Sequence, residues 1–243
     1  MSRQNIYDDG SFFSGYQQLR DAESGLNAAV EQPGLRALLP DPAGRTVLDL
    51  GCGDGTLARD LVARGAARVL GADPSARMLA LARARTTGPR VRYVQAFAED
   101  LSLRPTSVDL VVSSLALHYV ADLGTVLAQV ARWLRPGGWL VASMEHPMRT
   151  AELGRRDDPG AAGRYATEGR RDQAWFVDEV VKYHRRLSTI LGLVLRAGLE
   201  LRAVSEPVPG PAAIVARPEL DRHHRQPSIL VLAAVKRGAQ SPG

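Results

Sequence analysis

Hydrophobic positions recur along the chain with two periods, one typical of strands and one of helices. Val47 to Leu50 is an apolar run rich in branched side chains, which predicts a buried strand. Three glycines follow within residues 51–55, where the backbone must turn sharply. Beyond them Leu57 and Leu61 are four positions apart, as on one face of a helix. A strand, a glycine loop and a helix in this order indicate the opening of a nucleotide-binding α/β fold.

The alternation of strand and helix patterns continues to the end of the chain. We expect further strands at 69–72, 91–94, 108–113, 139–143, 199–204 and 228–235, and helices at 32–39, 75–85, 123–134 and 187–195. The Pro-Gly-Gly sequence at 136–138 predicts a turn into the fifth strand. The predicted fold class is therefore α/β.

Two regions depart from this alternation. Residues 1–45 precede the first strand and gather aromatic side chains, and Phe12, Tyr16 and Arg20 can share one helical face. Residues 148–174 are rich in glycine, arginine, aspartate and alanine and have no clear period, so we expect a long loop or lid there.

The glycine spacing and two acidic residues limit the class of ligand that the loop can bind. A dinucleotide fingerprint has glycine at its first, third and sixth positions, whereas Gly51, Gly53 and Gly55 occupy the first, third and fifth. Asp49 lies inside the strand before the loop, and Asp73 ends the second strand. An acid at that point can accept hydrogen bonds from both hydroxyls of a ribose. The anionic group at the helix N-terminus need not be a pyrophosphate.

Asp49 to Gly55, together with Gly71 to Ser75, resembles motif I and the acidic second-strand motif of class I S-adenosylmethionine-dependent methyltransferases. Residues 108–114 and 134–138 resemble further motifs of that family in the same order, so the resemblance covers roughly residues 45–145. It implies a Rossmann-like, doubly wound, mostly parallel seven-stranded sheet with helices on both faces and an antiparallel strand near one edge. The implied cofactor is S-adenosylmethionine, with S-adenosylhomocysteine as its product.

The resemblance also divides the chain. We expect an N-terminal helical cap at 1–45, a cofactor-binding core at 46–147, a lid insertion after the fifth strand at 148–186, the rest of the core sheet at 187–237 and a tail at 238–243. Such helical caps often cover the cofactor and the methyl acceptor in this family.

The family pattern implies which residues hold the cofactor. Gly51 and Gly53 would lie against its methionyl part, and Asp73 would bind its ribose. Arg20 would pair with the methionine carboxylate and Tyr16 would line the pocket, although packing of the helix explains both equally well. The expected set is Tyr16, Arg20, Asp49, Gly51, Cys52, Gly53, Asp73, Pro74, Met78, Phe97, Ala98 and Ser113.

Phe97 departs from the family pattern. Relatives commonly have an aspartate there, whose carboxylate receives the adenine amino group, and a phenyl ring cannot accept that hydrogen bond. Either the Phe97 ring packs on adenine while backbone groups near Ala98 give the polar contacts, or Glu99 substitutes. Met78 touches the adenine or simply packs the core.

Methyl transfer from a sulfonium needs aligned groups and excluded water rather than a covalent nucleophile. A base helps when the acceptor must lose a proton, and a neutral histidine suits that task. His118 follows the fourth strand, and Glu145-His146 ends the fifth, so both should face one cleft. We expect His118 or His146 as the base, with Glu145 orienting His146. The alternatives are histidines with structural hydrogen bonds and catalysis by proximity alone.

Composition limits the compartment and the partners that we expect for the protein. The 243 residues include a single cysteine, Cys52, which rules out a disulfide within the chain, and carry a formal net charge of +5. We see no signal peptide and no apolar run of the ~20 residues that a membrane span needs, so we expect a cytoplasmic protein. The basic residues are mostly scattered arginines, and their densest group, 222–225, predicts a solvated loop rather than a nucleic-acid site. No residues have metal-ligand spacing.

The preferred interpretation is an S-adenosylmethionine-dependent methyltransferase acting on an O, N or C nucleophile of a small molecule, for instance in specialised metabolism. Residues 145–147 and 183–185 are similar to those of a bacterial small-molecule subgroup. We expect no nucleic-acid or membrane partner, and a monomer or homodimer. Phe97 leaves two alternatives open, a cofactor-binding protein with a different reaction such as a cyclisation, and a binding or regulatory protein without turnover.

Overall fold

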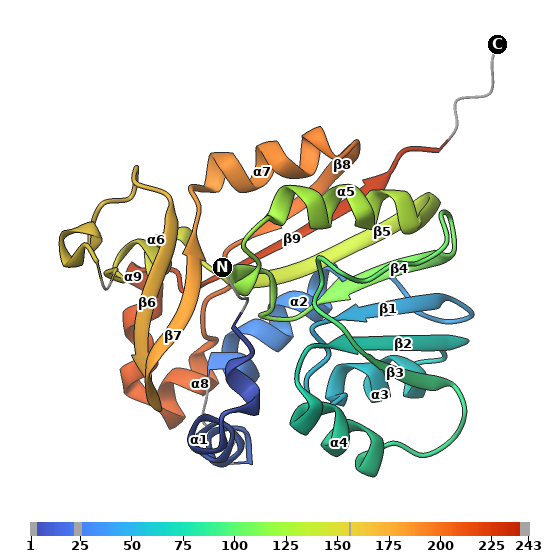
Figure 1. The fold of residues 1–243 in the computed structure, drawn as a ribbon, viewed down its shortest axis with the longest axis horizontal. Coiled ribbons are helices and arrows are strands. Elements are labelled where there is room, and N and C mark those ends of the chain that lie inside the picture. The colour runs from blue at the N-terminus through green and yellow to red at the C-terminus, as the bar shows by residue number, and fades with distance from the viewer. Residues whose placement is uncertain (1–3, 22–25, 156, 239–243) are drawn as a thin grey trace.

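The structure is a computed structural model that describes residues 4–21, 26–155 and 157–238, and its centre is a seven-stranded sheet (Figure 1). The strand order is β3-β2-β1-β4-β5-β9-β8. The first five strands are parallel, and β9 runs antiparallel to both β5 and β8. The strands are β1 Thr46–Leu50, β2 Arg68–Asp73, β3 Val91–Gln95, β4 Val108–Ser113, β5 Leu134–Glu145, β8 Leu199–Ser205 and β9 Ile229–Lys236. The predicted mostly parallel sheet is confirmed.

Helices cover both faces of this sheet, as Figure 1 shows with α5 and α7 on one side and α3 and α4 on the other. Successive residues of a strand point to opposite faces. Leu48 accordingly packs in the core under α5 and α7, whereas Val47 packs in the core under α2 and α3. The helices are α2 Gln32–Leu38, α3 Thr56–Ala63, α4 Ala76–Arg85, α5 Leu123–Trp133 and α7 Leu187–Arg196. An apolar run buried on both faces explains why β1 reads as a continuous hydrophobic segment.

The order of the strands reverses beside β1, which lies between β2 and β4. Asp49 is paired with Gly71 on one side and with Val112 on the other. In open α/β sheets, ligands bind where the strand order reverses, outside the carboxyl ends of the strands. The glycine loop after β1 and the loop after β4 lie at that place.

β5 is longer than the predicted strand at 139–143. It begins at Leu134, which pairs with Val108 across an irregularity in the register, and it ends at Glu145, opposite Ile229 of β9. The Pro-Gly-Gly turn therefore lies inside the span of β5, where Gly137 has φ +78°. The extension carries Glu145 to the carboxyl end of the sheet.

Helical segments precede the sheet. They are a 3₁₀ turn Ile6–Asp8, α1 Gly10–Asp21, a π-helical turn Asn27–Glu31 and then α2. Figure 1 places α1 beside the β6–β7 hairpin, at the end of the sheet where β1 and β4 terminate.

The insertion after β5 is more regular than expected. The sequence predicts a long loop or lid at 148–174, but this stretch contains most of a short helix and most of the first strand of a two-stranded antiparallel hairpin. The elements are α6 Pro147–Ala151, a 3₁₀ turn Pro159–Ala161, β6 Gly169–Trp175 and β7 Val177–His184. Phe176 forms the tight turn with φ +59°. The hairpin was missed because charged and glycine residues along β6 hide the alternation of a strand.

The connection between β8 and β9 also contains helices, α8 Pro211–Ala216, a 3₁₀ turn Pro218–Asp221 and α9 Arg222–Arg225. The prediction of a solvated loop at 222–225 is wrong in one respect, because His223 is buried and its Nδ1 lies 2.7 Å from the hydroxyl of Ser228. Over the described residues, no helix combines the length and the apolar character that crossing a membrane requires.

Candidate active site

The glycine loop wraps over the end of β2. The amides of Gly51 and Cys52 both donate to the carbonyl of Ala72, at 2.8 and 3.1 Å. The amide of Gly53 donates to Oδ2 of Asp73 at 2.9 Å. Gly51 and Gly53 have φ of +79° and +52°, a left-handed conformation that glycine adopts without the strain of a side chain. The loop thus ties the ends of β1 and β2 together.

Two of these glycines have different surroundings. A Cβ atom on Gly51 would lie 2.2 Å from the Cβ of Ala116, so the loop after β4 packs against that position. A Cβ on Gly53 would meet no atom within 4 Å. Gly51 is therefore needed for packing within the protein, whereas Gly53 borders open space in which a ligand can approach the backbone.

Asp49 and Asp73 stand on either side of the loop. Asp49 is 1% exposed, and both of its carboxylate oxygens lack a hydrogen-bond partner of ordinary geometry in the described structure. Burial and the nearby carboxylates raise the pKa of Asp49 to about 8. Asp73 is better satisfied, because it accepts hydrogen bonds from the amides of Gly53 and Ser75, yet burial raises its pKa to about 6. This end of the sheet favours a positively charged ligand.

Other predicted cofactor residues have contacts within the protein. The hydroxyl of Ser113 donates to the carbonyl of Leu50 at 2.8 Å and so joins β4 to β1. Cys52 is buried, and burial raises the pKa of its thiol, which leaves it a small neutral side chain in the turn. Met78 is buried on α4, where its amide donates to the Ser75 hydroxyl. These contacts give the three residues structural roles, and their contacts with a cofactor stay predictions.

Phe97 and Ala98 lie in a turn after β3. Both are partly buried, and the amides of Asp100 and Leu101 donate to the carbonyl of Phe97. Ala98 packs against the core under α5 and α7. Packing of the Phe97 ring on adenine and substitution by Glu99 both stay predictions.

The N-terminal segment is fastened to the end of β2. Asp8 accepts hydrogen bonds from the Ser75 hydroxyl at 2.6 Å and from the Arg77 amide at 3.1 Å. The Asn5 amide group donates to the carbonyl of Pro74 at 3.1 Å. The segment therefore covers the β2–α4 junction.

Four rings from three parts of the chain form an aromatic wall, defined here as Tyr7, Tyr16, Tyr119 and Trp175. Tyr7 lies 5.0 Å from Tyr16 and 6.1 Å from Tyr119, and Tyr16 lies 6.1 Å from Trp175, all measured between ring centroids and all edge to face. Burial raises the pKa of both Tyr7 and Tyr119, so both phenols are neutral donors. Tyr16 thus belongs to a cluster of aromatic side chains, and its contact with a cofactor stays a prediction. The side chain of Arg20 is outside the described part of α1, so its predicted role stays a prediction.

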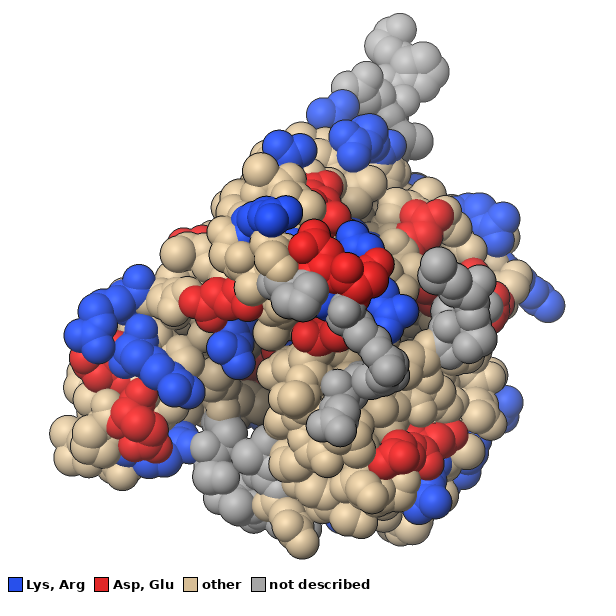
Figure 2. All heavy atoms as spheres, turned by 60° about the vertical axis from the view of Figure 1, so that its left-hand side comes forward, with Lys and Arg blue, Asp and Glu red and all other residues tan. Residues whose placement is uncertain are grey.

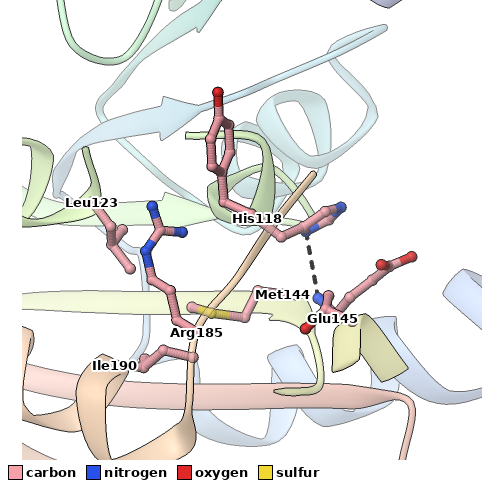
Figure 3. Close-up of a pocket in the computed structure, with 8 residues that line it drawn as sticks. His118, Leu123, Met144, Glu145, Arg185 and Ile190 are labelled. Atoms are coloured by element: carbon pink, nitrogen blue, oxygen red, sulfur yellow. Dashed lines mark hydrogen bonds between the residues drawn. The ribbon is translucent and has the colours of Figure 1, made fainter. Parts of the chain in front are cut away.

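His118 lines a small hollow with Met144, Glu145 and Arg185, as Figure 3 shows. Its Nδ1 accepts a hydrogen bond from the amide of Glu145 at 3.4 Å, which leaves the proton of the neutral ring on Nε2. Burial lowers the pKa of His118 to about 3. A base with that pKa takes up a proton poorly at neutral pH, so we expect His118 to position other groups rather than to accept a proton.

His146 has partners that the sequence did not indicate. Its Nδ1 accepts from the amide of Met148 and caps α6, and its Nε2 lies 2.7 Å from Oε1 of Glu206. The expectation that Glu145 orients His146 is corrected, because Glu206 fills that place and Glu145 pairs with Lys182. Both nitrogens of His146 are therefore engaged within the protein.

Lys182 is the main polar residue that sequence reasoning missed. It lies on β7, its side chain is 1% exposed, and its Nζ lies 2.6 Å from Oε1 of Glu145. Lys182 and Glu145 are 37 positions apart and meet only in the folded protein, so the surrounding sequence gives no local signal. The pair of lysine residues in this arginine-rich chain, Lys182 and Lys236, was the one available hint.

Surface charge is mixed on the side of the molecule that carries the β6–β7 hairpin. On the face shown in Figure 2, Lys and Arg side chains alternate with Asp and Glu rather than forming one continuous basic surface. Ion pairs within the insertion, such as Arg170 with Asp172 at 2.8 Å, neutralise several of its arginines.

Comparison with known proteins gives a consistent result. A family model described as a methyltransferase domain matches residues 48–142. The chain is similar to the crystal structure of an S-adenosylmethionine dependent methyltransferase from Mesorhizobium loti, with a TM-score of 0.80, 41% identity, and coverage of 87% of this chain and 100% of that one. It is 31% identical to an uncharacterized protein of Haemophilus influenzae over 94% of this chain and 96% of that protein. It is 37% identical to the ubiquinone biosynthesis O-methyltransferase of Rhizobium etli, but spans only 45% of that protein's length.

Proposed function

Because this chain belongs to the S-adenosylmethionine-dependent methyltransferases, we propose that it transfers the methyl group of S-adenosylmethionine to a small molecule held against the aromatic wall. The observation that carries the proposal is the buried carboxylate of Asp49, which has no hydrogen-bond partner of ordinary geometry in the described structure, beside the open approach to Gly53. S-adenosylmethionine carries an ammonium and a sulfonium, and these positive charges would stabilise the buried carboxylate. S-adenosylmethionine also supplies a methyl group that is already activated for displacement.

The residues present fit this cofactor. Asp73 is placed to accept hydrogen bonds from ribose hydroxyls with the lone pairs that Gly53 and Ser75 leave free. Gly53 permits close approach to the backbone, and Asp49 balances charge below the loop. Pro74 and Met78 follow Asp73, and the side chain of Asn5 contacts the carbonyl of Pro74 there.

The remaining groups position the acceptor and exclude water. The aromatic wall is built from side chains of the N-terminal segment, the loop after β4 and the β6–β7 hairpin, a setting that suits a small molecule better than a macromolecule. The mixed surface charge agrees with a partner other than nucleic acid. A relative named for ubiquinone biosynthesis acts on a small molecule, which supports the same class of acceptor. With His118 poorly basic, alignment and desolvation account for the rate.

Titration calorimetry of the purified protein tests the proposal. S-adenosylmethionine and S-adenosylhomocysteine should both bind with micromolar or tighter affinity, and NAD should bind at least tenfold more weakly. Asp73→Asn should weaken the binding of both sulfur compounds while the protein remains folded. Tighter binding of NAD than of S-adenosylmethionine would overturn the assignment of the cofactor.

A further inference from the structure

A buried ion pair closes the aromatic wall. Nζ of Lys182 lies 5.3 Å from the ring centroid of Trp175 and 5.8 Å from that of Tyr119. Since Tyr119, Tyr7, Tyr16 and Trp175 form a continuous series of contacts, the lysine joins the two ends of that series. Its ammonium also donates to Oε1 of Glu145 at 2.6 Å and to Oε1 of Gln173 at 2.5 Å. The β6–β7 hairpin thus meets the end of β5 through a charged contact inside a ring of aromatic side chains.

Stability alone is a weak reason for such a contact. Buried ion pairs can often be replaced by apolar residues of similar volume with little loss of stability, because both charges must be desolvated. Here the pair is also incompletely satisfied. Oε2 of Glu145 is buried and has no hydrogen-bond partner in the described structure. A buried acceptor without a partner is costly unless a ligand supplies the missing donor.

The two charges hold each other in place. Burial raises the pKa of the Glu145 carboxyl, but the charge and the hydrogen bond of the Lys182 ammonium help to hold the pKa below its ordinary value. Burial lowers the pKa of the Lys182 ammonium, and the Glu145 carboxylate partly offsets this. Figure 3 shows the Glu145 side chain turned away from Arg185, so the open oxygen faces a region without that guanidinium. The site therefore presents a carboxylate oxygen within a pair that has no net charge.

This arrangement selects among ligand groups. An anionic group would be repelled by Glu145, and a cationic group would be repelled by Lys182. A neutral hydroxyl meets neither cost and can donate to the open oxygen. The rings of the aromatic wall favour a flat body next to that hydroxyl.

We propose that Oε2 of Glu145 binds a hydroxyl group of an uncharged, flat aromatic methyl acceptor, and that Lys182 is the positioning residue that holds the carboxylate. The inference rests on the proposed methyltransferase function and adds the chemical class of the acceptor. Glu145 is then a recognition residue of the site rather than the partner of a catalytic histidine.

Four small probes test it with the protein saturated by S-adenosylhomocysteine, so that no turnover occurs. Catechol carries neutral hydroxyls, veratrole carries the same ring with methylated oxygens, benzoate is an anion and benzylamine is a cation at neutral pH. Calorimetry or ligand-observed NMR should show the tightest binding for catechol. This ranking needs no variant, so it stands whether or not a substituted protein folds.

Variants then assign the effect to the pair. Glu145→Gln and Lys182→Met should each weaken catechol about five- to tenfold, since a charge-assisted hydrogen bond becomes a neutral or misplaced one, and should leave the affinity for S-adenosylhomocysteine within about twofold. Glu168→Gln is the matched control, because Glu168 forms a more exposed ion pair with Arg186 at 3.1 Å near the same hairpin. That substitution should leave both affinities unchanged.

The outcomes separate the two proposals. The proposed acceptor class is wrong if benzoate, benzylamine or veratrole binds as tightly as catechol. It is also wrong if catechol fails to bind at millimolar concentration to protein that holds S-adenosylhomocysteine. Either result leaves the cofactor assignment intact. An unchanged catechol affinity in folded Glu145→Gln does the same for the role of that carboxylate. If S-adenosylhomocysteine itself fails to bind, the proposed function falls and this inference falls with it.

Discussion

The carboxylate of Asp8 lies 2.6 Å from the hydroxyl of Ser75, although 67 positions separate the two residues in the chain. Ser75 caps α4 by accepting from the amide of Met78, and Asp8 adds an acceptor for the Arg77 amide. A negative charge at a helix N-terminus is favourable. A residue of the N-terminal segment thus completes the cap of a helix that begins three positions after Asp73.

Removal of this remote cap should affect both stability and cofactor binding. Asp8→Ala deletes an acceptor at the start of α4, and loss of a capping side chain costs about 0.5–2 kcal/mol of the free energy of unfolding. Because the same contact fastens the N-terminal segment over the β2–α4 junction, the affinity for S-adenosylhomocysteine should fall as well. Chemical unfolding and calorimetry measure the two effects.

Asp122→Ala is the control for this change. Asp122 caps α5 by accepting from the Thr125 amide at 3.0 Å, so its loss should cost similar stability. It should leave cofactor affinity unaltered, because Asp122 bonds to Thr125 of its own helix and not to the β2–α4 junction. Equal losses of affinity in both variants would show that Asp8 acts only through global stability.

Gly53 and Gly137 offer a matched pair for locating the cofactor. Both have positive φ, +52° and +78°, and a Cβ on either would meet no protein atom within 4 Å. Alanine at each should therefore cost a similar amount, about 1–2 kcal/mol, from backbone strain alone. Only Gly53→Ala should also weaken the binding of S-adenosylmethionine, by tenfold or more. The methyl side chain of the new alanine enters the space that we assign to the cofactor. Equal affinities in the two variants would place the cofactor elsewhere.

Asp49 should make both stability and binding depend on pH. Its pKa is raised from 3.8 to about 8 in the folded protein, so between those values the folded state holds a proton that the unfolded state has lost. The free energy of unfolding should then fall as pH rises from about 4 to 8, by at most about 1.4 kcal/mol per unit from this group, and change no further above it. Asp49→Asn should flatten that slope in denaturant titrations.

The same carboxyl should release a proton when the cofactor binds. A positive ligand favours the ionised form of Asp49, so S-adenosylmethionine affinity should rise with pH up to about 8. Calorimetry at pH 7 in two buffers with different ionisation enthalpies measures the proton directly. An observed heat that is the same in both buffers would contradict the proposed contact.

His118 can be distinguished from a general base by a conservative substitution. The carboxamide oxygen of Asn can replace Nδ1 as the acceptor for the Glu145 amide, but Asn cannot take up a proton. With the pKa of His118 near 3, we expect His118→Asn to keep the single-turnover rate within about tenfold of the original. Loss of a true base would cost about 10²–10⁴-fold. A loss in that range, with the melting temperature preserved, would restore His118 as the base.

The sequence was most informative where chemistry and fold use the same residues. The run from Val47 to Gly55 predicted a strand, its turn and the following helix, because a strand buried on both faces is continuously apolar and its turn needs positive φ. Asp73 could be predicted because it ends the next strand, which is also an apolar run. These signals are local, and a single chain is enough to read them.

Contacts between distant segments could not be predicted in this way. Lys182 meets Glu145 only because β7 folds back against the end of β5, and no spacing along the chain encodes that distance. His146 was assigned the adjacent carboxylate, Glu145, whereas Glu206, 60 positions away, is its partner. Burial also decides the pKa of His118, and burial depends on the whole fold.

Two contacts join the N-terminal segment to a part of the chain that is synthesised much later. The side-chain oxygen of Gln4 accepts a hydrogen bond from the amide of Val181 in β7 at 2.8 Å, and the ring of Tyr16 packs beside Trp175. Residues 4 to 16 leave the ribosome long before residues 175 to 181, so these two contacts cannot form during most of translation. A growing chain can complete β1 to β4 and the glycine loop, but it cannot enclose an acceptor. Enclosure of the acceptor is therefore among the last steps of assembly, and a nascent chain halted before β7 would lack it.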